Sequence, residues 1–391
     1  MTRVAISGWF AGRAVGSGQY TDALVAALRA TARPGDAIDL VMPRSGGGPR
    51  TGQAIAKLVF EQRTFPGAAA GADVAHVPYW APPLRSRTPV VVTVHDLIPL
   101  VLPAYRARRA VRAYTDLVVH ATRRAAAVIA DSEHTAADIR AHLRVDPTAV
   151  HVVPLGVDAR YRAAGGVDGP GGTGGGTETD DAGEHRGDAS AGAAPDLAAR
   201  LRLPPRYGLY LGGFDARKNV ATLLAAWRAV HAASGVPLVI AGAPPAGDDP
   251  LFPDPRALAR RAGLPAEALR CIGFVGEADK PALLAGAAVF AYPSRYEGFG
   301  LPPLEAMACG TPVVVAAATS LPEVVGDAGL RVDPDDVGGW AEALLAVLED
   351  ADAAARMRAA GLARASGFTW RRTAERTWAI YRSVAGAGGA A

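Results

Sequence analysis

Short runs of hydrophobic, β-branched residues alternate along the chain with longer amphipathic segments. This alternation predicts a parallel β-sheet that is covered by helices on both faces. The first series of runs ends near residue 157, and its expected strands have the sequences RVAISG, AIDLVM, DVAHVP, PVVVTV, AAVIA and VHVVP. The expected helices of this series cover residues 18–30, 105–124 and 133–143.

A second series of the same kind begins near residue 204. Its expected strands are YGLYLGG, PLVIAG, LRCIGFVG, AAVFAYPS and TPVVVAA, and its expected helices cover residues 218–233, 255–262 and 302–309. Residues 337–385 are predicted to be mostly helical. The fold class is therefore α/β, with two Rossmann-like, doubly wound parallel-sheet domains.

The segment between the two series, residues 163–196, has a different composition. Eleven of its 34 residues are glycine, seven are acidic and one is basic, and it contains no Leu, Ile, Phe or Trp. Such a segment buries too little apolar surface to offset its chain entropy, so we expect a disordered Gly/Asp-rich insertion. The expected divisions are a domain over 1–157, a linker over 158–203, a domain over 204–367 and a C-terminal segment over 368–391.

Charge and cysteine content narrow the functional classes. The 391 residues include 41 Lys and Arg against 38 Asp and Glu, a net charge of +3 that gives no argument for nucleic acid as a partner. Two cysteines make no disulfide framework, so we expect a cytoplasmic protein. The start of the chain, MTRVAISGWF, lacks the pattern of a signal peptide, and Gly310 and Pro312 interrupt the longest uncharged stretch, so no membrane span is expected.

Residues that can carry chemistry follow the expected strands, where open α/β sheets bind their ligands. After the first strand, Gly16 and Gly18 precede a helix and would let backbone amides approach a phosphate. A flexible turn explains these glycines equally well. His95 and Asp96 directly follow PVVVTV. A structural histidine is the alternative interpretation of His95.

Two adjacent cations, Arg217 and Lys218, follow YGLYLGG at the expected start of a helix. Cations at a helix N-terminus oppose the helix dipole unless an anion lies there. We therefore expect these two side chains to hold a diphosphate, the guanidinium as a fork and the ammonium as a point charge.

The segment EGFGLPPLEA, residues 297–306, is the most informative. Its glycines expose backbone amides, its prolines suit the first turn of a helix, and its two carboxylates, Glu297 and Glu305, flank that turn. A carboxylate accepts two hydrogen bonds from a vicinal diol, so Glu305 suits a ribose and Glu297 suits sugar hydroxyls or developing positive charge. Capping or surface acids, the alternative, would not explain an otherwise apolar, Gly-rich segment.

These motifs together closely resemble the retaining GT-B glycosyltransferases of family 4, also called group 1. The resemblance rests on HD after a strand, G-x(4)-RKN, and E-x(7)-E in EGFGLPPLEAMACGTPVV followed by SLPEVVGDAG, and it covers the chain except residues 163–196. It implies a GT-B fold, in which the domains face a central cleft. The N-terminal domain would bind the acceptor, the C-terminal domain a nucleotide sugar, and a final helix would cross back to the N-terminal domain.

The resemblance also implies roles in donor binding for the EGFG segment. Glu305 would hold the ribose and Glu297 would face the donor sugar. The backbone at Phe299, Gly300 and Leu301 would contact sugar hydroxyls and phosphate.

Further roles follow from the same resemblance. Arg217 and Lys218 match the diphosphate cations, Gly16 and Gly18 match the N-terminal glycine loop, and His95 matches the histidine beside the donor sugar. His95, Lys218 and Glu297 would be the catalytic residues.

The implied activity is transfer of a hexose with retention of configuration, with mannose from GDP-mannose as the favoured donor. The acceptor would be a hydroxyl of a glycan, a glycolipid or a small molecule. The alternatives are a UDP-sugar donor carrying glucose or GlcNAc, a nucleotide-sugar epimerase, and a non-catalytic nucleotide-sugar-binding protein. A dinucleotide dehydrogenase is disfavoured, because the first loop lacks the third small residue and the acidic ribose reader.

No metal and no cofactor are expected. The DxD of Asp333 and Asp335 precedes a helix and is interpreted as its cap. Arginines on and beside the expected helix 105–124 would suit peripheral contact with the anionic inner face of a membrane, and an ordinary solvated helix face is the alternative.

Overall fold

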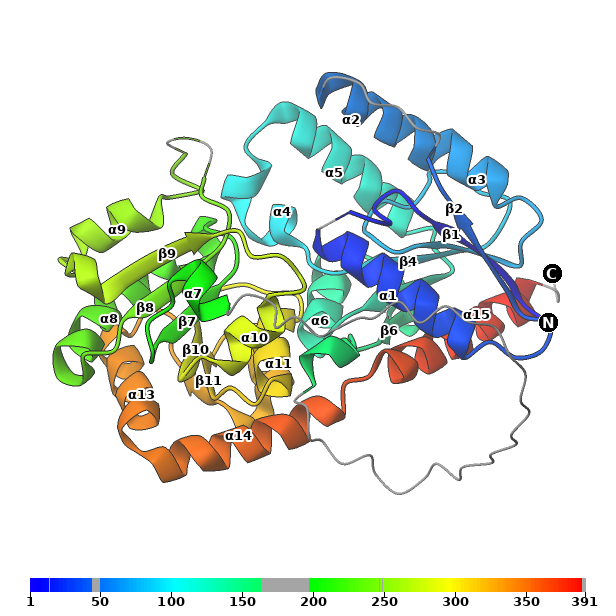
Figure 1. Cartoon of the computed structure of the whole chain (residues 1–391). Helices are drawn as coiled ribbons and strands as arrows, with labels where there is room; N and C mark the ends of the chain where they lie inside the picture. The colour runs from blue at the N-terminus through cyan, green and yellow to red at the C-terminus, as the bar shows by residue number, and fades with distance from the viewer. Residues whose placement is uncertain (14, 44–49, 163–196, 246, 248, 389–391) are drawn as a thin grey trace, which may run out of the picture.

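The computed structural model describes residues 1–13, 15–43, 50–162, 197–245, 247 and 249–388, so the insertion predicted over 163–196 lies outside the described residues. The chain forms two six-stranded parallel sheets with helices on their faces, as the alternating pattern predicts (Figure 1). In Figure 1 the half that contains the first sheet is on the right and the half that contains the second is on the left.

The first sheet has the strand order β2-β1-β3-β4-β5-β6. Its strands are β1 (Arg3–Ser7), β2 (Ala37–Val41), β3 (Val74–Val77), β4 (Val90–Val94), β5 (Ala127–Ala130) and β6 (Val150–Val152). Every residue of β3, β4 and β5 is buried, as expected for central strands of a parallel sheet covered on both faces.

The helices of this half extend beyond the three that the pattern predicts. They are α1 (Gly16–Ala30), α2 (Arg50–Val59), the π-helical turn η1 (Phe60–Thr64), α3 (Phe65–Ala68), α4 (Ile98–Val101), the 3₁₀ turn η2 (Pro103–Arg106), α5 (Arg109–Thr122), α6 (Glu133–His142), and the 3₁₀ turns η3 (Pro147–Ala149) and η4 (Ala159–Tyr161). The helix expected over 105–124 is divided between η2 and α5, because Arg108 takes an extended conformation at the start of α5.

Alternate residues of the first sheet serve two different cores. Val4 and Ile6 of β1 pack in the cluster that includes Leu24 of α1. Ala5, between them, belongs to a second cluster with Phe60. Because successive side chains of a strand point to opposite faces, both faces of this sheet are buried.

The second sheet has the order β12-β11-β10-β7-β8-β9. Its strands are β7 (Gly208–Leu211), β8 (Leu238–Ala241), β9 (Leu269–Gly273), β10 (Val289–Tyr292), β11 (Val313–Ala316) and β12 (Leu330–Val332). The strand order reverses between β7 and β10, which pair directly. The crevice beyond the carboxyl ends at such a reversal is the usual ligand site of an open α/β sheet.

The helices that follow in sequence surround this sheet, except α15, which packs on the first half (Figure 1). They are α7 (Leu197–Leu201), the 3₁₀ turn η5 (Ala216–Lys218), α8 (Val220–Ser234), α9 (Pro255–Arg261), the 3₁₀ turn η6 (Ala266–Ala268), α10 (Lys280–Ala285), α11 (Leu301–Ala308), α12 (Leu321–Val325), the 3₁₀ turn η7 (Gly326–Ala328), α13 (Val337–Glu349), α14 (Ala351–Ser366) and α15 (Trp370–Gly388). Helix α8 begins two residues later than expected, because Asn219 has a left-handed backbone with φ 56°.

The chain segment that leaves the first half at residues 156–157 contacts the segment that returns to it at residues 368–370. The backbone N–H of Val157 donates to the carbonyl of Phe368 at 3.1 Å. Gly156 lies so close to the backbone of Trp370 that a Cβ would clash with it. The hinges expected at 156–158 and 366–368 are therefore neighbours, while hinge motion and the domain boundaries stay predictions.

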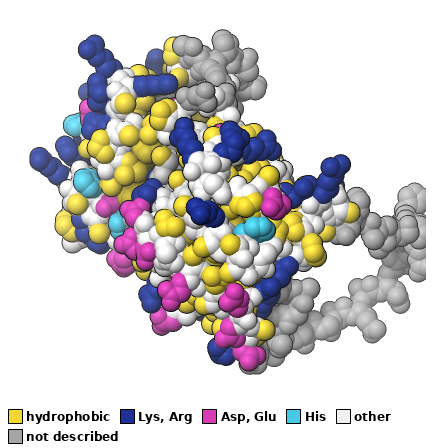
Figure 2. Space-filling model, turned by 90° about the vertical axis from the view of Figure 1, so that its left-hand side faces the viewer, with side chains coloured by type: hydrophobic (Ala, Val, Ile, Leu, Met, Phe, Trp, Pro, Cys, Tyr) yellow, Lys and Arg dark blue, Asp and Glu magenta, His cyan; other side chains and the backbone are white. Residues whose placement is uncertain are grey.

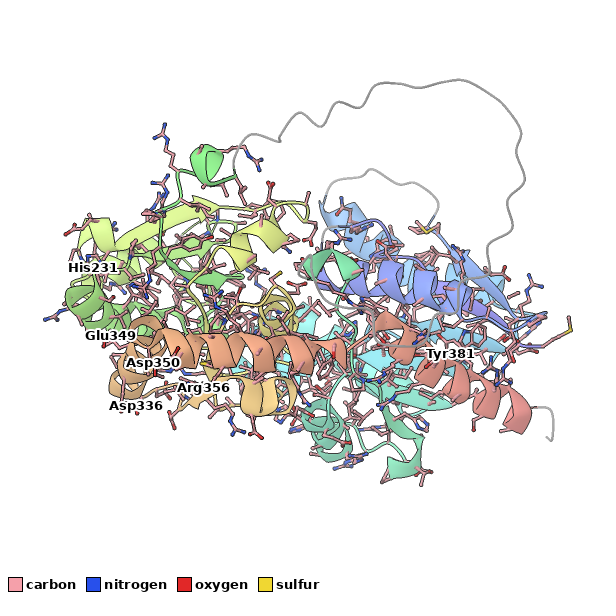
Figure 3. The ribbon with its side chains drawn as sticks, turned by 60° about the horizontal axis from the view of Figure 1, so that its bottom comes forward. His231, Asp336, Glu349, Asp350, Arg356 and Tyr381 are labelled. Atoms are coloured by element: carbon pink, nitrogen blue, oxygen red, sulfur yellow. The ribbon has the colours of Figure 1, made fainter. Side chains whose placement is uncertain are left out.

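Helix α15 packs on the first half although it follows the second in sequence. Its Trp378 Nε1 donates to the carbonyl of Leu28 in α1 at 3.1 Å, and the Tyr381 hydroxyl lies 2.5 Å from Nδ1 of His76 in β3. Figure 3 shows α14 along the second half, with Asp350 at its start, followed by α15 along the first half, where Tyr381 lies.

One face of the second half carries charges of both signs. In Figure 2 Lys and Arg side chains dominate the upper part of this face and most acidic side chains lie in the lower part, so neither sign covers it. Within the described ranges, no helix is long and apolar enough to cross a membrane.

Candidate active site

The loops that follow β7 and β10 bring two cations to one carboxylate. Nζ of Lys218 lies 2.6 Å from Oε1 of Glu297 and 2.7 Å from the hydroxyl of Tyr292. Nη1 of Arg217 lies 3.2 Å from Oε2 of the same carboxylate. Because β7 and β10 are neighbours in the sheet, residues 79 positions apart meet here.

The charges of this cluster are balanced and largely shielded from water. Burial alone would raise the pKa of Glu297, but the charges of Lys218 and Arg217 lower it to about 2, so the carboxylate is ionised at neutral pH. Nε of Arg217 lies 3.0 Å from Oδ1 of Asp215 but is buried and makes no hydrogen bond among the described residues. In the structure, the anion beside these two cations is the carboxylate of Glu297. The diphosphate that the sequence pattern predicts at this place stays a prediction.

His95 follows β4 and is fixed on both sides of its ring. Nδ1 lies 2.6 Å from Oδ2 of Asp131, and Nε2 lies 3.3 Å from the carbonyl oxygen of Pro78. The ring stands edge-on to Tyr20 at 4.6 Å between centroids. Burial alone would lower the pKa of His95, but the Asp131 carboxylate offsets this and raises it. With an acceptor at each ring nitrogen, His95 is suited to carry both protons.

The EGFG segment reaches across to the first half and touches His95. A Cβ on Gly298 would clash with the backbone carbonyl of His95, so only glycine fits there. The hydroxyls of Ser132 and Thr135 donate to the carbonyl of Gly298 at 2.6 and 2.9 Å. Gly300, at the start of α11, has φ 114°, a conformation that favours glycine.

Residues on both sides of the segment hold its backbone in place. The Ser320 hydroxyl donates to the carbonyls of Glu297 and Phe299 at 2.9 and 2.7 Å. Phe299 is buried, and its ring stands edge-on to Phe368 at 5.9 Å. Phe299, Gly300 and Leu301, whose backbone is predicted to contact the donor, therefore lie on a hydrogen-bonded turn that leads into α11.

Glu305 lies in a separate cavity of about 330 Å³ between α1 and α11. Leu301, Tyr161 and Gln19 also line this cavity. Burial raises the pKa of Glu305 to about 7. The Tyr161 hydroxyl donates to Oε2 of Glu277 at 3.2 Å beside it, so the cavity offers a group of oxygen acceptors suited to hydroxyl ligands.

The first turn of α1 lies between two cavities. Ser17 lines a cavity of about 290 Å³ that also contains His95, and Gln19 lines the cavity of Glu305. Gly16 has open space where a Cβ would stand, whereas Gly18 lies against the backbone of Arg13 and Phe10. Gly18 is therefore needed for the packing of its own loop, and Gly16 leaves the helix start accessible.

A second carboxylate joins the two halves. Glu323 in α12 accepts from the backbone N–H groups of Glu133 and His134 at 3.0 and 3.1 Å, so it caps the start of α6. This contact lies close in sequence to the Ser132 and Thr135 contacts with Gly298. We refer to these three residues, Ser132, Thr135 and Glu323, as the clasp.

The predicted role of the DxD pair as a helix cap is wrong. Asp336, not Asp333 or Asp335, caps α13, because its side chain accepts from the backbone N–H of Gly339 at 2.9 Å. Asp335 instead forms a surface ion pair with Arg295. Among the described residues, no group of three or more His, Cys, Asp or Glu is placed to hold a metal ion. Metal independence stays a prediction.

Most of the arginines proposed for membrane contact are engaged within the protein. The partners are Asp116 for Arg106, and the carbonyls of Ala107, Leu143 and Leu84 for Arg112, Arg123 and Arg124. Peripheral contact with a membrane stays a prediction.

Sequence reasoning missed several residues of the site. Asp131 directly follows β5, so the rule that chemistry follows strands could have identified it. Tyr292 is the last residue of β10 and belongs to none of the motifs, so no sequence signal marks it. Glu323 belongs to the SLPEVVGDAG segment, but its contact with α6 depends on how the two halves meet.

Comparisons with known proteins identify the family. A family model described as "Glycosyltransferase Family 4" matches residues 16–161, and one described as "Glycosyl transferases group 1" matches residues 205–350. O-antigen chain mannosyltransferase B of Escherichia coli is 42% identical over 178 residues. That alignment covers 45% of this chain and 45% of the relative, less than half the length of either.

Solved structures share the whole fold. A sucrose-phosphate synthase from Thermosynechococcus elongatus has a TM-score of 0.72 and 21% identity, covering 99% of this chain and 100% of that one. The Anabaena protein HepE, solved in complex with UDP and glucose, has a TM-score of 0.68 and 18% identity, covering 98% of this chain and 100% of that one. With a match to a family model in each half and the two-sheet GT-B architecture, the chain belongs to the family 4 (group 1) glycosyltransferases.

Proposed function

We propose that the chain is a retaining glycosyltransferase that moves mannose from GDP-mannose to a hydroxyl group of a glycan. The similarity to a mannosyltransferase of O-antigen chains supports both the sugar and the glycan acceptor. The observation that carries the proposal is the cluster of Lys218, Arg217 and Glu297 at the strand-order reversal.

The cluster suits the charge changes of sugar transfer. When the bond between C1 of the sugar and the diphosphate oxygen breaks, negative charge grows on the diphosphate and positive charge grows at C1. The positive charges of Lys218 and Arg217 would stabilise the diphosphate. Glu297, ionised at neutral pH, would face C1.

Retention follows if the acceptor attacks from the face that the diphosphate leaves. The acceptor oxygen then forms the new bond to C1, and its proton passes to the departing phosphate oxygen. No side chain has to act as a base in this scheme. His95, suited by its two acceptors to carry both protons, would exchange its 3.3 Å contact with the Pro78 carbonyl for a hydrogen bond to the donor sugar, and would not remove a proton.

The cavity of Glu305 would hold the ribose. Its carboxylate would accept hydrogen bonds from the two vicinal hydroxyls, and the open helix start at Gly16 would lie toward the phosphates.

A UDP-sugar donor is the second candidate. A structure with the same fold is described as a complex with UDP and glucose. Both donors carry a ribose and a diphosphate, so the cluster and the Glu305 cavity would serve either one.

Thermal denaturation with GDP, UDP, GDP-mannose or UDP-glucose tests the donor, because a bound ligand raises the melting temperature by mass action. We expect GDP and GDP-mannose to raise it, and Lys218→Ala to reduce the shift. Arg356→Ala, which removes an exposed cation of α14, is the matched control and should keep the shift. A shift with uridine nucleotides alone would replace GDP-mannose with a UDP-sugar. No shift with any of the four would overturn the proposal.

A further inference from the structure

A tyrosine of the first half contacts the ion cluster of the second half. The hydroxyl of Tyr105, in η2, donates to Oδ1 of Asp215 at 3.0 Å and accepts from the backbone N–H of Arg217 at 3.2 Å. We propose that Tyr105 is a positioning residue for the reaction, because it occupies the Asp215 carboxylate and thereby leaves Arg217 to the diphosphate. This inference rests on the proposed function, since it concerns a cation that would bind the diphosphate of the donor.

The Asp215 carboxylate would otherwise compete with a diphosphate for Arg217. Nε of Arg217 lies 3.0 Å from Oδ1 of Asp215, the same oxygen that accepts from Tyr105. Asp215 is the N-cap residue of η5, but its side chain makes no capping hydrogen bond and lies toward Tyr105 and Arg217 instead. The charged side chains of Asp215 and Arg217 are 12% and 15% exposed, so their attraction is stronger than it would be in water. An unoccupied carboxylate here would hold the guanidinium as an ion pair.

The Tyr105 hydroxyl weakens this competition. Burial raises the pKa of Tyr105, so the hydroxyl keeps its proton at neutral pH and donates it to Asp215. This hydrogen bond occupies one lone pair of Oδ1 and reduces the attraction of that oxygen for a second donor. Nη1 of Arg217 is held instead by the carbonyl of Tyr296 at 2.6 Å and by Oε2 of Glu297 at 3.2 Å. The guanidinium therefore stays in the cluster, where the diphosphate is expected.

A second tyrosine makes the reverse contact between the halves. From the second half, the hydroxyl of Tyr296 donates to Oδ2 of Asp138 at 2.7 Å and accepts from the backbone N–H of Leu97 at 3.3 Å. Asp138 and Leu97 lie outside the cluster, so this hydroxyl joins the halves without contacting Arg217. Tyr296 and Tyr105 therefore make the same two kinds of hydrogen bond across one interface, and only Tyr105 makes them to the cluster and its Asp215 neighbour.

A double-mutant cycle tests the inference, with calorimetric binding of inorganic pyrophosphate and of GDP to the whole chain. Pyrophosphate has the charge of a diphosphate without a base or a sugar, so its binding does not depend on which nucleotide sugar is the donor. We expect Tyr105→Phe, which keeps the ring of a half-buried side chain, to weaken both ligands about tenfold. Asp215→Asn should then strengthen binding about tenfold in Tyr105→Phe, but less than threefold in the unmodified chain, where Tyr105 already occupies the carboxylate.

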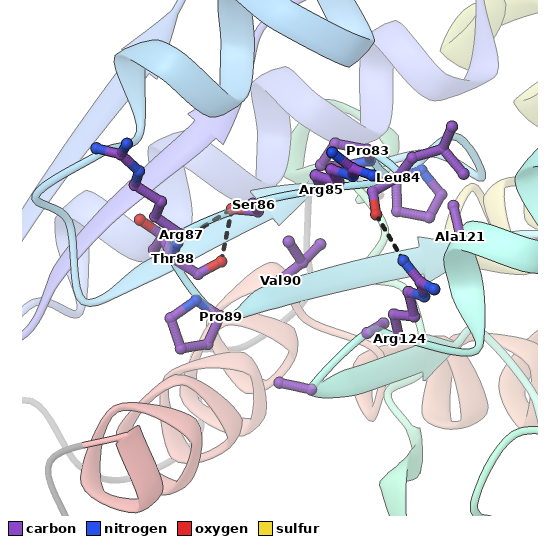
Figure 4. Close-up of a pocket in the computed structure, with 13 residues that line it drawn as sticks. Pro83, Leu84, Arg85, Ser86, Arg87, Thr88, Pro89, Val90, Ala121 and Arg124 are labelled. Atoms are coloured by element: carbon purple, nitrogen blue, oxygen red, sulfur yellow. Dashed lines mark hydrogen bonds between the residues drawn. The ribbon is translucent and has the colours of Figure 1, made fainter. Parts of the chain in front are cut away.

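Two control variants separate positioning from other effects. Tyr296→Phe removes the other hydroxyl that joins the halves, and Asp215→Asn should strengthen binding no more in this background than in the unmodified chain. Arg124→Ala shows whether pyrophosphate binds elsewhere, because Arg124 and two further arginines line a cavity of about 440 Å³ at the start of β4 (Figure 4). The loss caused by Tyr105→Phe should be the same with and without Arg124.

The outcomes separate this inference from the proposed function. Equal gains from Asp215→Asn with and without the Tyr105 hydroxyl would overturn the inference, because they would reflect only the removal of a negative charge. Unchanged affinity in Tyr105→Phe, or a loss that Asp215→Asn does not reverse, would also overturn it. The expected cycle with pyrophosphate but no binding of GDP would support the inference and overturn GDP-mannose as the donor. Binding of neither ligand to the unmodified chain would overturn both.

Discussion

At the scale of single residues, the buried ion cluster explains why two cations can stand together before α8. Lys218 contributes one of the two positive charges that hold Glu297 ionised. The same ammonium is placed to stabilise a departing diphosphate, so its loss affects both the resting site and the transition state.

We therefore expect Lys218→Ala to lower kcat by about a hundredfold to a thousandfold, as for loss of one preorganised donor of charge stabilisation. The fold-decrease in kcat should be larger than the fold-change in KM for an acceptor glycan. Steady-state kinetics with varied acceptor and saturating donor measure this, with Arg356→Ala as the control that removes an exposed cation. A kcat within threefold of the unmodified chain would remove Lys218 from the catalytic residues.

Glu305 makes the pH dependence of donor binding predictable. Burial raises its pKa to about 7, so it is mostly protonated at pH 6 and mostly ionised at pH 8. The ionised form accepts both hydrogen bonds of a ribose diol, so affinity should rise with pH, and not fall, through this range. The affinity for GDP should increase up to about tenfold more in the unmodified chain than in Glu305→Gln.

Calorimetric titration with GDP at both pH values checks this prediction. The ionisation of GDP itself changes the affinity of both proteins equally. The difference in pH dependence between the unmodified chain and Glu305→Gln therefore reports the ionisation of the Glu305 carboxyl group. Equal pH dependence in the two proteins would show that Glu305 does not contact the ribose.

At the scale of elements, α15 is held to the first half by large buried side chains. Trp378 is 1% exposed and bonds to α1. Trp378→Ala should lower the free energy of unfolding by about 3–5 kcal/mol, the range for loss of a large buried aromatic side chain. Trp378→Phe should cost clearly less, because it refills most of the volume and loses only the hydrogen bond to Leu28.

Urea denaturation of both variants provides the comparison. A loss below about 1 kcal/mol for Trp378→Ala would mean that α15 contributes little to the stability of the first half.

The strands were predictable because they consist of continuous buried runs such as Val90–Val94. The edge strand β12 was not, since two of its three residues are exposed and no hydrophobic run marks it. The helices over residues 50–68 were also missed, although Ile55, Leu58 and Val59 of α2 have the i, i+3, i+4 spacing of one helix face. The structure leaves these three side chains exposed. The late start of α8 depends on the conformation of one residue, Asn219.

The candidate site was predictable only where it follows local motifs. Lys218, Glu297 and His95 were found because they follow strands. Their contacts could not be found, since the ion pair of Lys218 and Glu297 depends on the strand order and the pair of His95 and Asp131 on two adjacent strands. Neither contact can be predicted from local sequence, because the partners are 79 and 36 residues apart.

At the scale of the whole molecule, the clasp ties the EGFG segment to the first half. Glu323 bridges two backbone N–H groups of α6 from the opposite half, a contact that we expect to be worth about 1–2 kcal/mol. Removing it should shift the chain toward a more open arrangement.

Small-angle X-ray scattering of Glu323→Ala without nucleotide should therefore give a larger radius of gyration than the unmodified chain, and GDP-mannose should reduce the difference. Glu349→Ala, at the exposed end of α13, is the matched control (Figure 3). Identical radii for all three proteins would mean that the clasp does not hold the halves together.

The central claim is that this chain transfers mannose with retention. The most direct measurement is nuclear magnetic resonance of the chain with GDP-mannose, labelled with ¹³C at C1 of the mannose, and a mannosyl oligosaccharide acceptor. We predict one new glycosidic C1 signal with the anomeric configuration of the donor, and one GDP released for each bond formed. A new bond of inverted configuration, or release of GDP without any new glycosidic signal, would contradict the account.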